Sequence, residues 1–377
     1  MKITGVRTHI LQAALSRHFA SSRGWYDTRA AMLVEIETDQ GLVGWGECYG
    51  PARITAAVVD NVAAWLIGKD PLPTEYLWQM IYAGLRDHGP KGVIIQGLSG
   101  IDIALWDIKG KYFGVPVQQL LGGAQRTELV AYATGLLRRQ VDDPACYLAE
   151  EAAGYAAEGF SAVKLKVGFG EEEDMAATRL VREAIGPAVK LMIDANHAYD
   201  SVAAIRLGRA IEQYDVAWFE EPVPPEDIAG YQNVRTLLPI PVAGGECEFT
   251  RFGFRELFVS RALDIAQPDV CAAGGLSECK KIADMAEAFG VRYNPHVWGT
   301  GLAMAASLHL LAVLPSHTPS ALRPIEPMLE FDRTEHPIRE AILTEPIEHT
   351  RGVVRVPEGA GLGIEIDRKA LARFSAQ

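Results

Sequence analysis

The chain has 377 residues, of which 49% are apolar and 22% are charged, a composition typical of a globular protein. This length predicts either two domains or a single α/β barrel with an appendage. A net charge of −12 argues against nucleic acid or an anionic membrane as the partner, because surfaces that bind them are cationic.

A small molecule is therefore the expected partner. The sequence has no apolar stretch of the roughly 20 residues needed to cross a bilayer, and its first residues lack the apolar core of a signal peptide. We therefore predict a cytoplasmic location. The five cysteines form no CxxC pair and show no zinc-finger spacing, so we expect neither a disulfide framework nor a structural zinc.

The first part of the chain has the pattern of strands followed by helices. Residues 1–47 contain β-rich runs around the turn sequence Asp39-Gln40-Gly41, which predicts a small meander. Between Ile54 and Leu121 apolar residues recur at helical spacing, and Gly122-Gly123 marks the end of this pattern. Residues 1–123 are thus predicted to form an α+β domain.

Residues 124–342 alternate between short β-branched or apolar runs and helical stretches. This repeat predicts βα units around a parallel sheet. Seven units, with an eighth strand near PIEPMLEF, fit a closed barrel better than an open sheet. The seven runs are ELVAYAT, SAVKLKV, VKLMIDA, VAWFEEP, IPVAGGE, LDIAQPD and VRYNPHV. No GxGxxG or Walker loop supports a nucleotide cofactor. Residues 343–377 are predicted to fold back onto the first domain.

The carboxyl ends of parallel barrel strands form the catalytic face of a barrel, so ionisable residues that end these runs are site candidates. Lys164 and Lys166 point to one side of their strand because strand side chains alternate, and their small or β-branched neighbours suggest that this side is the barrel interior. For an isolated KxK pair, a solvated strand face would be the better interpretation. The ionisable residues that end the following runs favour the barrel interior instead.

Three consecutive runs end in the carboxylates Asp194, Glu220 and Glu246, each 26 residues from the next. This spacing equals one βα unit and predicts that the three groups converge at one height, where they would repel one another unless a cation lies among them. Oxygen ligands without His or Cys favour Mg²⁺ over Zn²⁺. The alternative, a helix-capping role, is credible for any single carboxylate but much less so for three at one spacing.

Asp269 and His296 end the next two runs, again about one unit apart. A lone His would more often be structural, but an Asp beside a His orients the imidazole and raises its basicity, which suggests one half of an acid/base pair. With a metal nearby, this set predicts removal of a proton α to a carboxylate and stabilisation of the enediolate by the ion. Lys164 and the metal are expected to lower the pKa of Lys166, which is a base only when neutral.

At this point the residues resemble the enolase superfamily, mandelate racemase subgroup, over almost the whole chain. The motifs are GIDIALWDIKGK, LLGG, KLK, MIDANHAY, WFEEP, GGE, QPDVCAAGG and NPHVWGTG. The resemblance implies an α+β capping domain over a modified (β/α)7β TIM-like barrel, and a homo-oligomer, an octamer or a smaller even-numbered ring. It implies that Asp194, Glu220 and Glu246 hold one Mg²⁺, with Asn196 and Glu221 near the metal. Lys166 and His296 would be the acid/base residues, with Asp269 behind His296. Lys164 would contact the substrate carboxylate.

Within the subgroup, MKITGVRTH, VGWGEC, WLIGKDP and IEPMLEFDRT look most similar to the galactarolactone cycloisomerases. The resemblance implies an enzyme that removes the proton α to the free carboxylate of a galactaro-lactone and expels the ring oxygen β to it, giving a deoxy-keto hexarate. The alternative is dehydration of an open-chain sugar acid, an aldarate or aldonate. In that reaction hydroxide leaves and needs an acid, for which His296 is the candidate.

Substrate-facing residues are expected in the stretch from Arg17 to Tyr26, which is rich in cationic and aromatic groups. It is interpreted as a loop between the first two strands, and an ordinary exposed loop is an equal alternative. If it closes over the barrel, His18 or Arg23 is placed to pair with a distal carboxylate, and Trp25 or Trp298 to pack on a sugar face.

Two other classes fit the sequence less well. Metal-dependent barrel hydrolases use His-rich ligands such as HxH early in the barrel, and none occurs. A non-catalytic sugar-acid binding protein would not need paired lysines facing an Asp–His pair.

Overall fold

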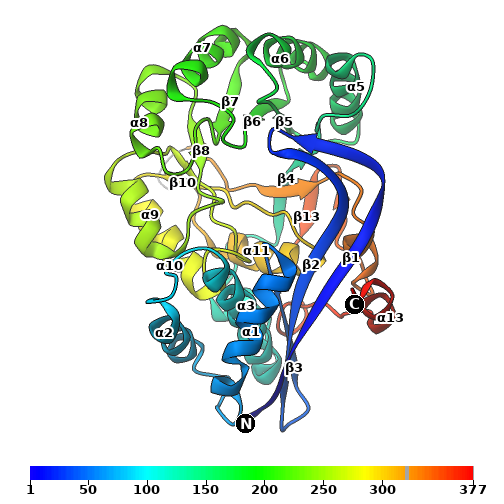
Figure 1. Cartoon of the computed structure of the whole chain (residues 1–377), viewed down its shortest axis with the longest axis vertical. Helices are drawn as coiled ribbons and strands as arrows, with labels where there is room; N and C mark the ends of the chain where they lie inside the picture. The colour runs from blue at the N-terminus through cyan, green and yellow to red at the C-terminus, as the bar shows by residue number, and fades with distance from the viewer. Residues whose placement is uncertain (319–321, 377) are drawn as a thin grey trace.

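The computed structural model describes residues 1–318 and 322–376, which form an α+β cap beside an α/β barrel (Figure 1). The cap sheet is antiparallel, in the order β1 (Ile3–Ser21), β2 (Gly24–Thr38) and β3 (Val43–Cys48). Its helices are α1 (Ala52–Leu66), α2 (Thr74–Leu85), α3 (Val93–Phe113) and the short α4 (Val117–Leu120). The predicted order of strands followed by helices is therefore present.

Helix α3 packs tightly on β3 because glycines of VGWGEC leave room for its backbone. A Cβ atom at Gly46 would lie 1.8 Å from the carbonyl oxygen of Gly100, so no other residue fits there without movement. The helix ends at Gly114, whose φ of 68° is the left-handed conformation that commonly terminates helices.

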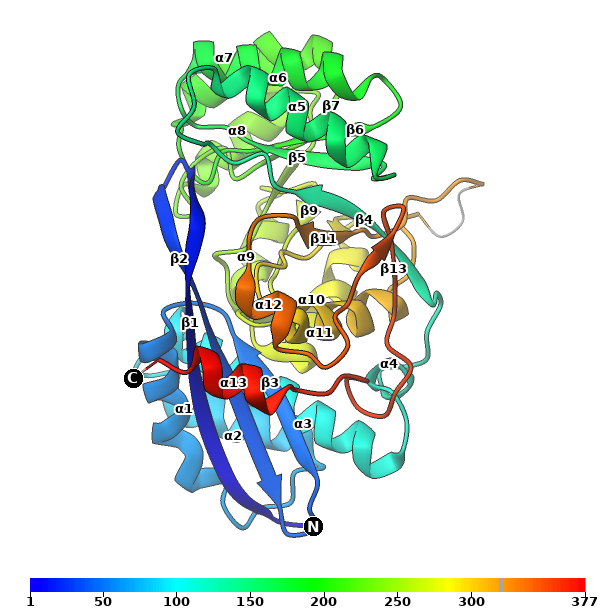
Figure 2. The ribbon, with the colours of Figure 1, turned by 90° about the vertical axis from the view of Figure 1, so that its right-hand side faces the viewer.

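Strands β1 and β2 form a longer hairpin than the predicted meander. The stretch from Arg17 to Tyr26, expected to be a loop, mostly continues both strands, with Phe19 paired to Tyr26 and Ser21 to Gly24. The hairpin tip reaches the end of the barrel near β5 and β6 (Figures 1 and 2). The physical reason is packing: the Phe19 and Tyr26 rings stack 5.3 Å apart, and Phe19 lies edge-on to Trp298 of the barrel.

Among the residues that the structure describes, the barrel has eight parallel strands, with β4 hydrogen-bonded to both β5 and β11. The strands are β4 (Glu128–Thr134), β5 (Ala162–Lys166), β6 (Lys190–Asp194), β7 (Val216–Glu220), β8 (Val242–Gly244), β9 (Ile265–Ala266), β10 (Arg292–Tyr293) and β11 (Leu329–Asp332). The first seven are each followed by a helix: α5 (Pro144–Ala157), α6 (Glu171–Ile185), α7 (Ser201–Ile211), α8 (Ile228–Leu237), α9 (Thr250–Val259), α10 (Gly275–Ala288) and α11 (Gly301–Val313). The predicted (β/α)7β barrel with a cap is confirmed, and its eighth strand begins within PIEPMLEF and ends one residue after it, at Asp332.

The C-terminal segment contacts both parts of the molecule. Helix α12 (Pro337–Ala341) precedes it, and the segment contains β12 (His349–Thr350), β13 (Val353–Arg355) and α13 (Arg368–Phe374). Strand β13 pairs antiparallel with β4, and the amide of Ala376 donates a 2.8 Å hydrogen bond to the carbonyl of Ile10 in β1. Among the described residues, no helix has the length and apolar character needed to cross a membrane.

Candidate active site

The carboxyl ends of β5, β6 and β7 bring predicted residues into register. Lys166 is the Cα partner of Asp194, and Asp194 is the partner of Glu220. Glu246 differs from the prediction, because β8 ends at Gly244 and Glu246 lies in the following loop. Gly245, with φ of 114°, makes the turn between them. Equal spacing in sequence thus places two carboxylates on strands and the third on a loop.

The three carboxylates nevertheless converge. Asp194, Glu220 and Glu246 are all buried, and one oxygen of each lies within 4.8 Å of the others. Burial raises the pKa of Glu220 to about 7; Lys164 opposes this rise, and Asp194 adds to it. A buried all-oxygen set with mutual repulsion fits a hard divalent cation such as Mg²⁺, which would relieve that repulsion.

Lys166 is held beside this group. Its Nζ forms an ion pair with Asp194 and donates a 3.0 Å hydrogen bond to Oδ1 of Asn196. Burial and Lys164 lower the pKa of Lys166, but the charges of Asp194, Glu246 and Glu220 together outweigh them, and the pKa is raised in the protein alone. The predicted downward shift is therefore not present here. It assumed a bound metal ion, whose charge would oppose that of Asp194.

Lys164 lies deeper than predicted. It is fully buried, and its Nζ lies 2.7 Å from Oε1 of Glu220 and 2.7 Å from Oε1 of Glu330 in β11. It does not line the pocket that contains Lys166. The reason is geometric. A strand rises about 3.3 Å per residue, so Lys164, two residues before Lys166, lies about 6.6 Å deeper in the barrel. In this structure Lys164 thus contacts two protein carboxylates, and its contact with a substrate carboxylate stays a prediction.

Glu330 is a site residue that the sequence analysis missed. One oxygen accepts a 2.6 Å hydrogen bond from Thr134, and the other accepts a 2.9 Å bond from the amide of Val297. It therefore ties Lys164 to the loop that carries His296. The only signal for Glu330 in the sequence was the alternation of side chains along PMLEFD, which places Glu330 inside the eighth strand.

Asp269 and His296 meet as predicted, although both lie in loops beyond β9 and β10. Nδ1 of His296 lies 2.6 Å from Oδ2 of Asp269, and Nε2 lies 3.5 Å from Oε2 of Glu246. Burial lowers the pKa of His296, whereas Glu246 and the hydrogen bond with Asp269 raise it, to about 10 overall. In the absence of a metal, both Lys166 and His296 therefore favour the protonated form at neutral pH.

One pocket joins these groups to the hairpin. Lys166, Asn196, Glu246, His296 and Trp298 line it from the barrel, and Ser21, Arg23 and Tyr26 line it from the hairpin. His18 and Trp25 are exposed and do not line it, so this pocket does not support their substrate contacts, which stay predictions. Trp25 points away because side chains alternate along β2: Tyr26 stacks on Phe19 toward the barrel, and its neighbour faces away.

Tyr26 and Tyr49 are pocket residues to which the sequence analysis assigned no substrate contact. The Tyr49 ring packs edge-on against His296, with ring centroids 5.2 Å apart. Tyr49 follows directly after β3 of the cap, so the cap contributes to the pocket at two places.

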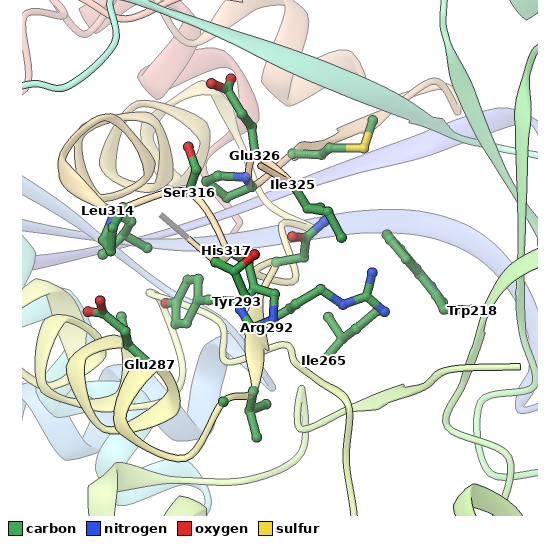
Figure 3. Close-up of a pocket in the computed structure, with 18 of the residues that line it drawn as sticks. Trp218, Ile265, Glu287, Arg292, Tyr293, Leu314, Ser316, His317, Ile325 and Glu326 are labelled. Atoms are coloured by element: carbon green, nitrogen blue, oxygen red, sulfur yellow. The ribbon is translucent and has the colours of Figure 1, made fainter. Parts of the chain in front are cut away.

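A larger cavity lies at the opposite end of the barrel (Figure 3). It has a volume of about 490 Å³ and is lined by residues at the amino ends of strands, including Trp218, Ile265 and Arg292. None of the predicted catalytic or metal-binding residues borders it. Because barrel enzymes work at the carboxyl ends of their strands, cavity volume does not identify the site here.

Sequence comparisons agree with this geometry. Residues 6–122 match the mandelate racemase/muconate lactonizing enzyme N-terminal domain, and residues 147–370 match the enolase C-terminal domain-like family. D-galactarolactone cycloisomerase of Agrobacterium fabrum is 52% identical over 374 residues, covering 99% of both chains. Arabinonate dehydratase of Saccharolobus solfataricus is 36% identical, covering 89% of this chain and 88% of that protein.

Solved structures show the same relationship. The 3,6-anhydro-D-galactonate cycloisomerase of Zobellia galactanivorans superposes with a TM-score of 0.91 at 41% identity, with 100% of each chain covered. A racemase from Streptomyces coelicolor with bound magnesium has a TM-score of 0.88 at 29% identity, with 99% of this chain and 100% of that chain covered. The chain belongs to the mandelate racemase/muconate lactonizing enzyme family of the enolase superfamily.

Proposed function

We propose that the protein is a magnesium-dependent isomerase that opens the ring of a galactaro-lactone by β-elimination to give a deoxy-keto hexarate. One observation carries this proposal: Lys166 and the Asp269-backed His296 line a single pocket beside three converging carboxylates. The cycloisomerase of Agrobacterium fabrum, 52% identical over nearly the full length, supports the substrate class.

Asp194, Glu220 and Glu246 are the proposed ligands of one Mg²⁺ per subunit. When bound, the ion supplies electrostatic stabilisation to negative charge on the substrate carboxylate. Lys166 and His296 divide the proton transfers: one takes the α-proton, and one returns a proton when the enol product becomes the ketone. Asp269 holds the His296 ring in place through its 2.6 Å contact with Nδ1.

The ring oxygen needs little acid assistance because it leaves as part of a carboxylate. The C–H bond at the α carbon breaks, a C=C bond forms, the C–O bond at the β carbon breaks, and no atom is lost from the substrate. The new carboxylate appears at the end of the molecule away from the proposed metal ligands. Arg23 lines the pocket from the hairpin and is the proposed partner for this charge.

Dehydration of an open-chain sugar acid is the second candidate, favoured by the 36% identity to an arabinonate dehydratase. It would use the same enolisation, but hydroxide would leave and would need a proton. His296 is the proposed donor, because it lines the pocket and its contact with Asp269 stabilises the protonated imidazole.

Proton NMR in deuterium oxide tests both candidates. Galactaro-lactones and open-chain hexarates would be incubated with enzyme and Mg²⁺, with Lys166→Ala as the control. Conversion of a lactone to a deuterated deoxy-keto acid, absent in the control, is the expected result. Turnover of open-chain acids alone would make the protein a dehydratase. Absence of exchange with every substrate would reject the sugar-acid assignment.

We also propose the division into residues 1–123, 124–342 and 343–377, a cytoplasmic location, and an even-numbered homo-oligomer of up to eight subunits. The contact of Ala376 with Ile10 supports the return of the C-terminal segment to the cap. The assembly rests on family resemblance, and light scattering coupled to size-exclusion chromatography measures it directly.

A further inference from the structure

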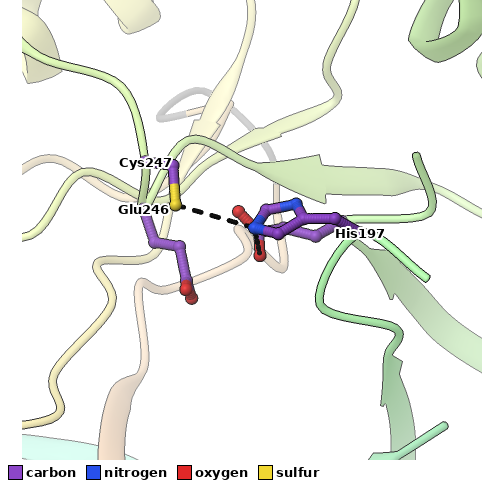
Figure 4. A group of neighbouring side chains, drawn as sticks. His197, Glu246 and Cys247 are labelled. Atoms are coloured by element: carbon purple, nitrogen blue, oxygen red, sulfur yellow. Dashed lines mark hydrogen bonds and ion pairs between the residues drawn. The ribbon is translucent and has the colours of Figure 1, made fainter. Parts of the chain in front are cut away.

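A second group of possible metal ligands lies beside the three carboxylates. His197 follows β6, Glu221 follows β7, and Cys247 follows Glu246 in the loop after β8. One ligand atom from each, together with one oxygen of Glu246, lies within 4.8 Å of the others. Figure 4 shows Cys247 and His197 facing each other, with Glu246 on the same loop as Cys247. His197, Glu221 and Cys247 do not line the catalytic pocket, and the proposed reaction does not use them.

The spacing of these atoms matches a tetrahedral thiolate site. Nε2 of His197 lies 3.6 Å from Sγ of Cys247 and 3.1 Å from Oε2 of Glu221. Zinc bonds of about 2.3 Å to sulfur and about 2.0–2.1 Å to nitrogen or oxygen, at tetrahedral angles, require about 3.6 Å between sulfur and nitrogen and about 3.3 Å between nitrogen and oxygen. Both separations are thus met with little movement of the side chains.

Glu221 supplies a second observation. The residue is only 1% exposed, and apart from the 3.1 Å contact with Nε2 of His197, which lacks hydrogen-bond geometry, its Oε2 has no donor among the residues that the structure describes. It also follows Glu220 directly in the chain and lies in one cluster with Glu246. A buried carboxylate oxygen without a donor is costly, and a cation at the centre of the cluster would satisfy it.

We propose that His197, Glu221 and Cys247 form a binding site for a thiophilic divalent cation such as Zn²⁺. Imidazole and thiolate ligands distinguish it from the all-oxygen set of Asp194, Glu220 and Glu246, which suits a hard ion. Binding requires Cys247 to release its thiol proton to solvent and ligate as the thiolate. Because Glu246 belongs to both groups, occupation of the thiolate site weakens Mg²⁺ binding at the neighbouring one.

Cobalt is the probe for this site, because a Co²⁺–thiolate bond gives an intense near-ultraviolet charge-transfer absorption that oxygen ligands do not. Co²⁺ would be titrated into the Mg²⁺-saturated protein. We expect the band to saturate at one equivalent, to disappear on addition of Zn²⁺, and to be absent in Cys247→Ser. Cys146→Ser is the matched control, since Cys146 is exposed on α5, and it should retain the band.

His197→Asn provides a second variant that keeps the test decisive if Cys247→Ser fails to fold by circular dichroism. His197 has φ of 69°, and Asn tolerates that left-handed conformation better than most residues. The variant should keep the thiolate band but bind Co²⁺ at least about 10-fold more weakly, as expected for loss of a ligand. Absence of the band in the wild type, or its persistence in Cys247→Ser, would overturn the proposal. No turnover is measured, so the result does not depend on the substrate assignment.

Discussion

Nδ1 of His296 and Oδ2 of Asp269 lie 2.6 Å apart, although each residue stands in a loop beyond the end of its strand. The negative charge of Asp269 helps to raise the pKa of His296 to about 10, against the effect of burial and alongside that of Glu246. Two neighbouring strand-end loops therefore set both the orientation and the protonation of the imidazole.

Replacing Asp269 by Asn should lower the pKa of His296, because the imidazolium loses a negative neighbour. The limb of the pH–rate profile that reports His296 should then move to lower pH, and kcat should fall by about 10²-fold or more. The pH profiles of kcat and of kcat/KM for wild type and Asp269→Asn measure both effects. A large loss of activity with an unmoved profile would contradict this role for Asp269.

Removal of divalent cations should abolish turnover and reduce stability. A ligand at 100 times its Kd stabilises the folded state by about 2.7 kcal/mol, so adding Mg²⁺ to chelator-treated protein should raise the Tm. Glu220→Gln removes one proposed ligand and should largely remove this shift. Glu226→Gln, an exposed carboxylate six residues further along, should retain it. An equal rise in Tm in both variants would argue against Glu220 as a ligand.

Arg23→Met should reduce kcat for a galactaro-lactone by about 10-fold or more, because a charge-assisted hydrogen bond to the departing carboxylate is lost. Arg17→Met serves as the control, since Arg17 is exposed on the same hairpin and does not line the pocket. Steady-state kinetics separate the effects: a rise in KM with unchanged kcat would mean that Arg23 binds the substrate without assisting departure of the carboxylate.

His309 should make the protein sensitive to acid. It is fully buried in α11; Nε2 lies 3.0 Å from the carbonyl of Leu362, and burial lowers the pKa to about 4. The unfolded chain takes up the proton first as pH falls, so the stability that neutral His309 provides is present above pH ~6.5 and declines towards pH 4. The loss should be about 1.4 kcal/mol per pH unit in this window.

Urea unfolding of wild type and His309→Gln between pH 7 and pH 4 tests this prediction. The difference in unfolding free energy between the two proteins should shrink with falling pH and level off near pH 4. His88→Gln, at an exposed position in the cap, should follow the wild type. Parallel curves for wild type and His309→Gln would show that the acid sensitivity arises elsewhere.

Strand assignments were predictable because each barrel strand is a short apolar run between helical stretches. The positions of Asp194 and Glu220 followed directly, since both end strands in register and adjacent parallel strands of similar length end at one level. The hairpin was less predictable. Arg17 to Tyr26 is polar enough to suggest a loop, whereas in the fold the packing of Phe19 and Tyr26 and the backbone bridge between Ala20 and Arg138 hold it extended.

The sequence by itself determined the fold family, the order of the βα units and the chemical types of residue at the strand ends, because periodicity and spacing are local properties of the chain. Only the tertiary structure decided that Lys164 is sealed between Glu220 and Glu330, that Glu246 reaches the carboxylate cluster from a loop, and that Cys247 faces His197. These relationships depend on depth inside the barrel and on loop paths, which are set by contacts between residues far apart in sequence.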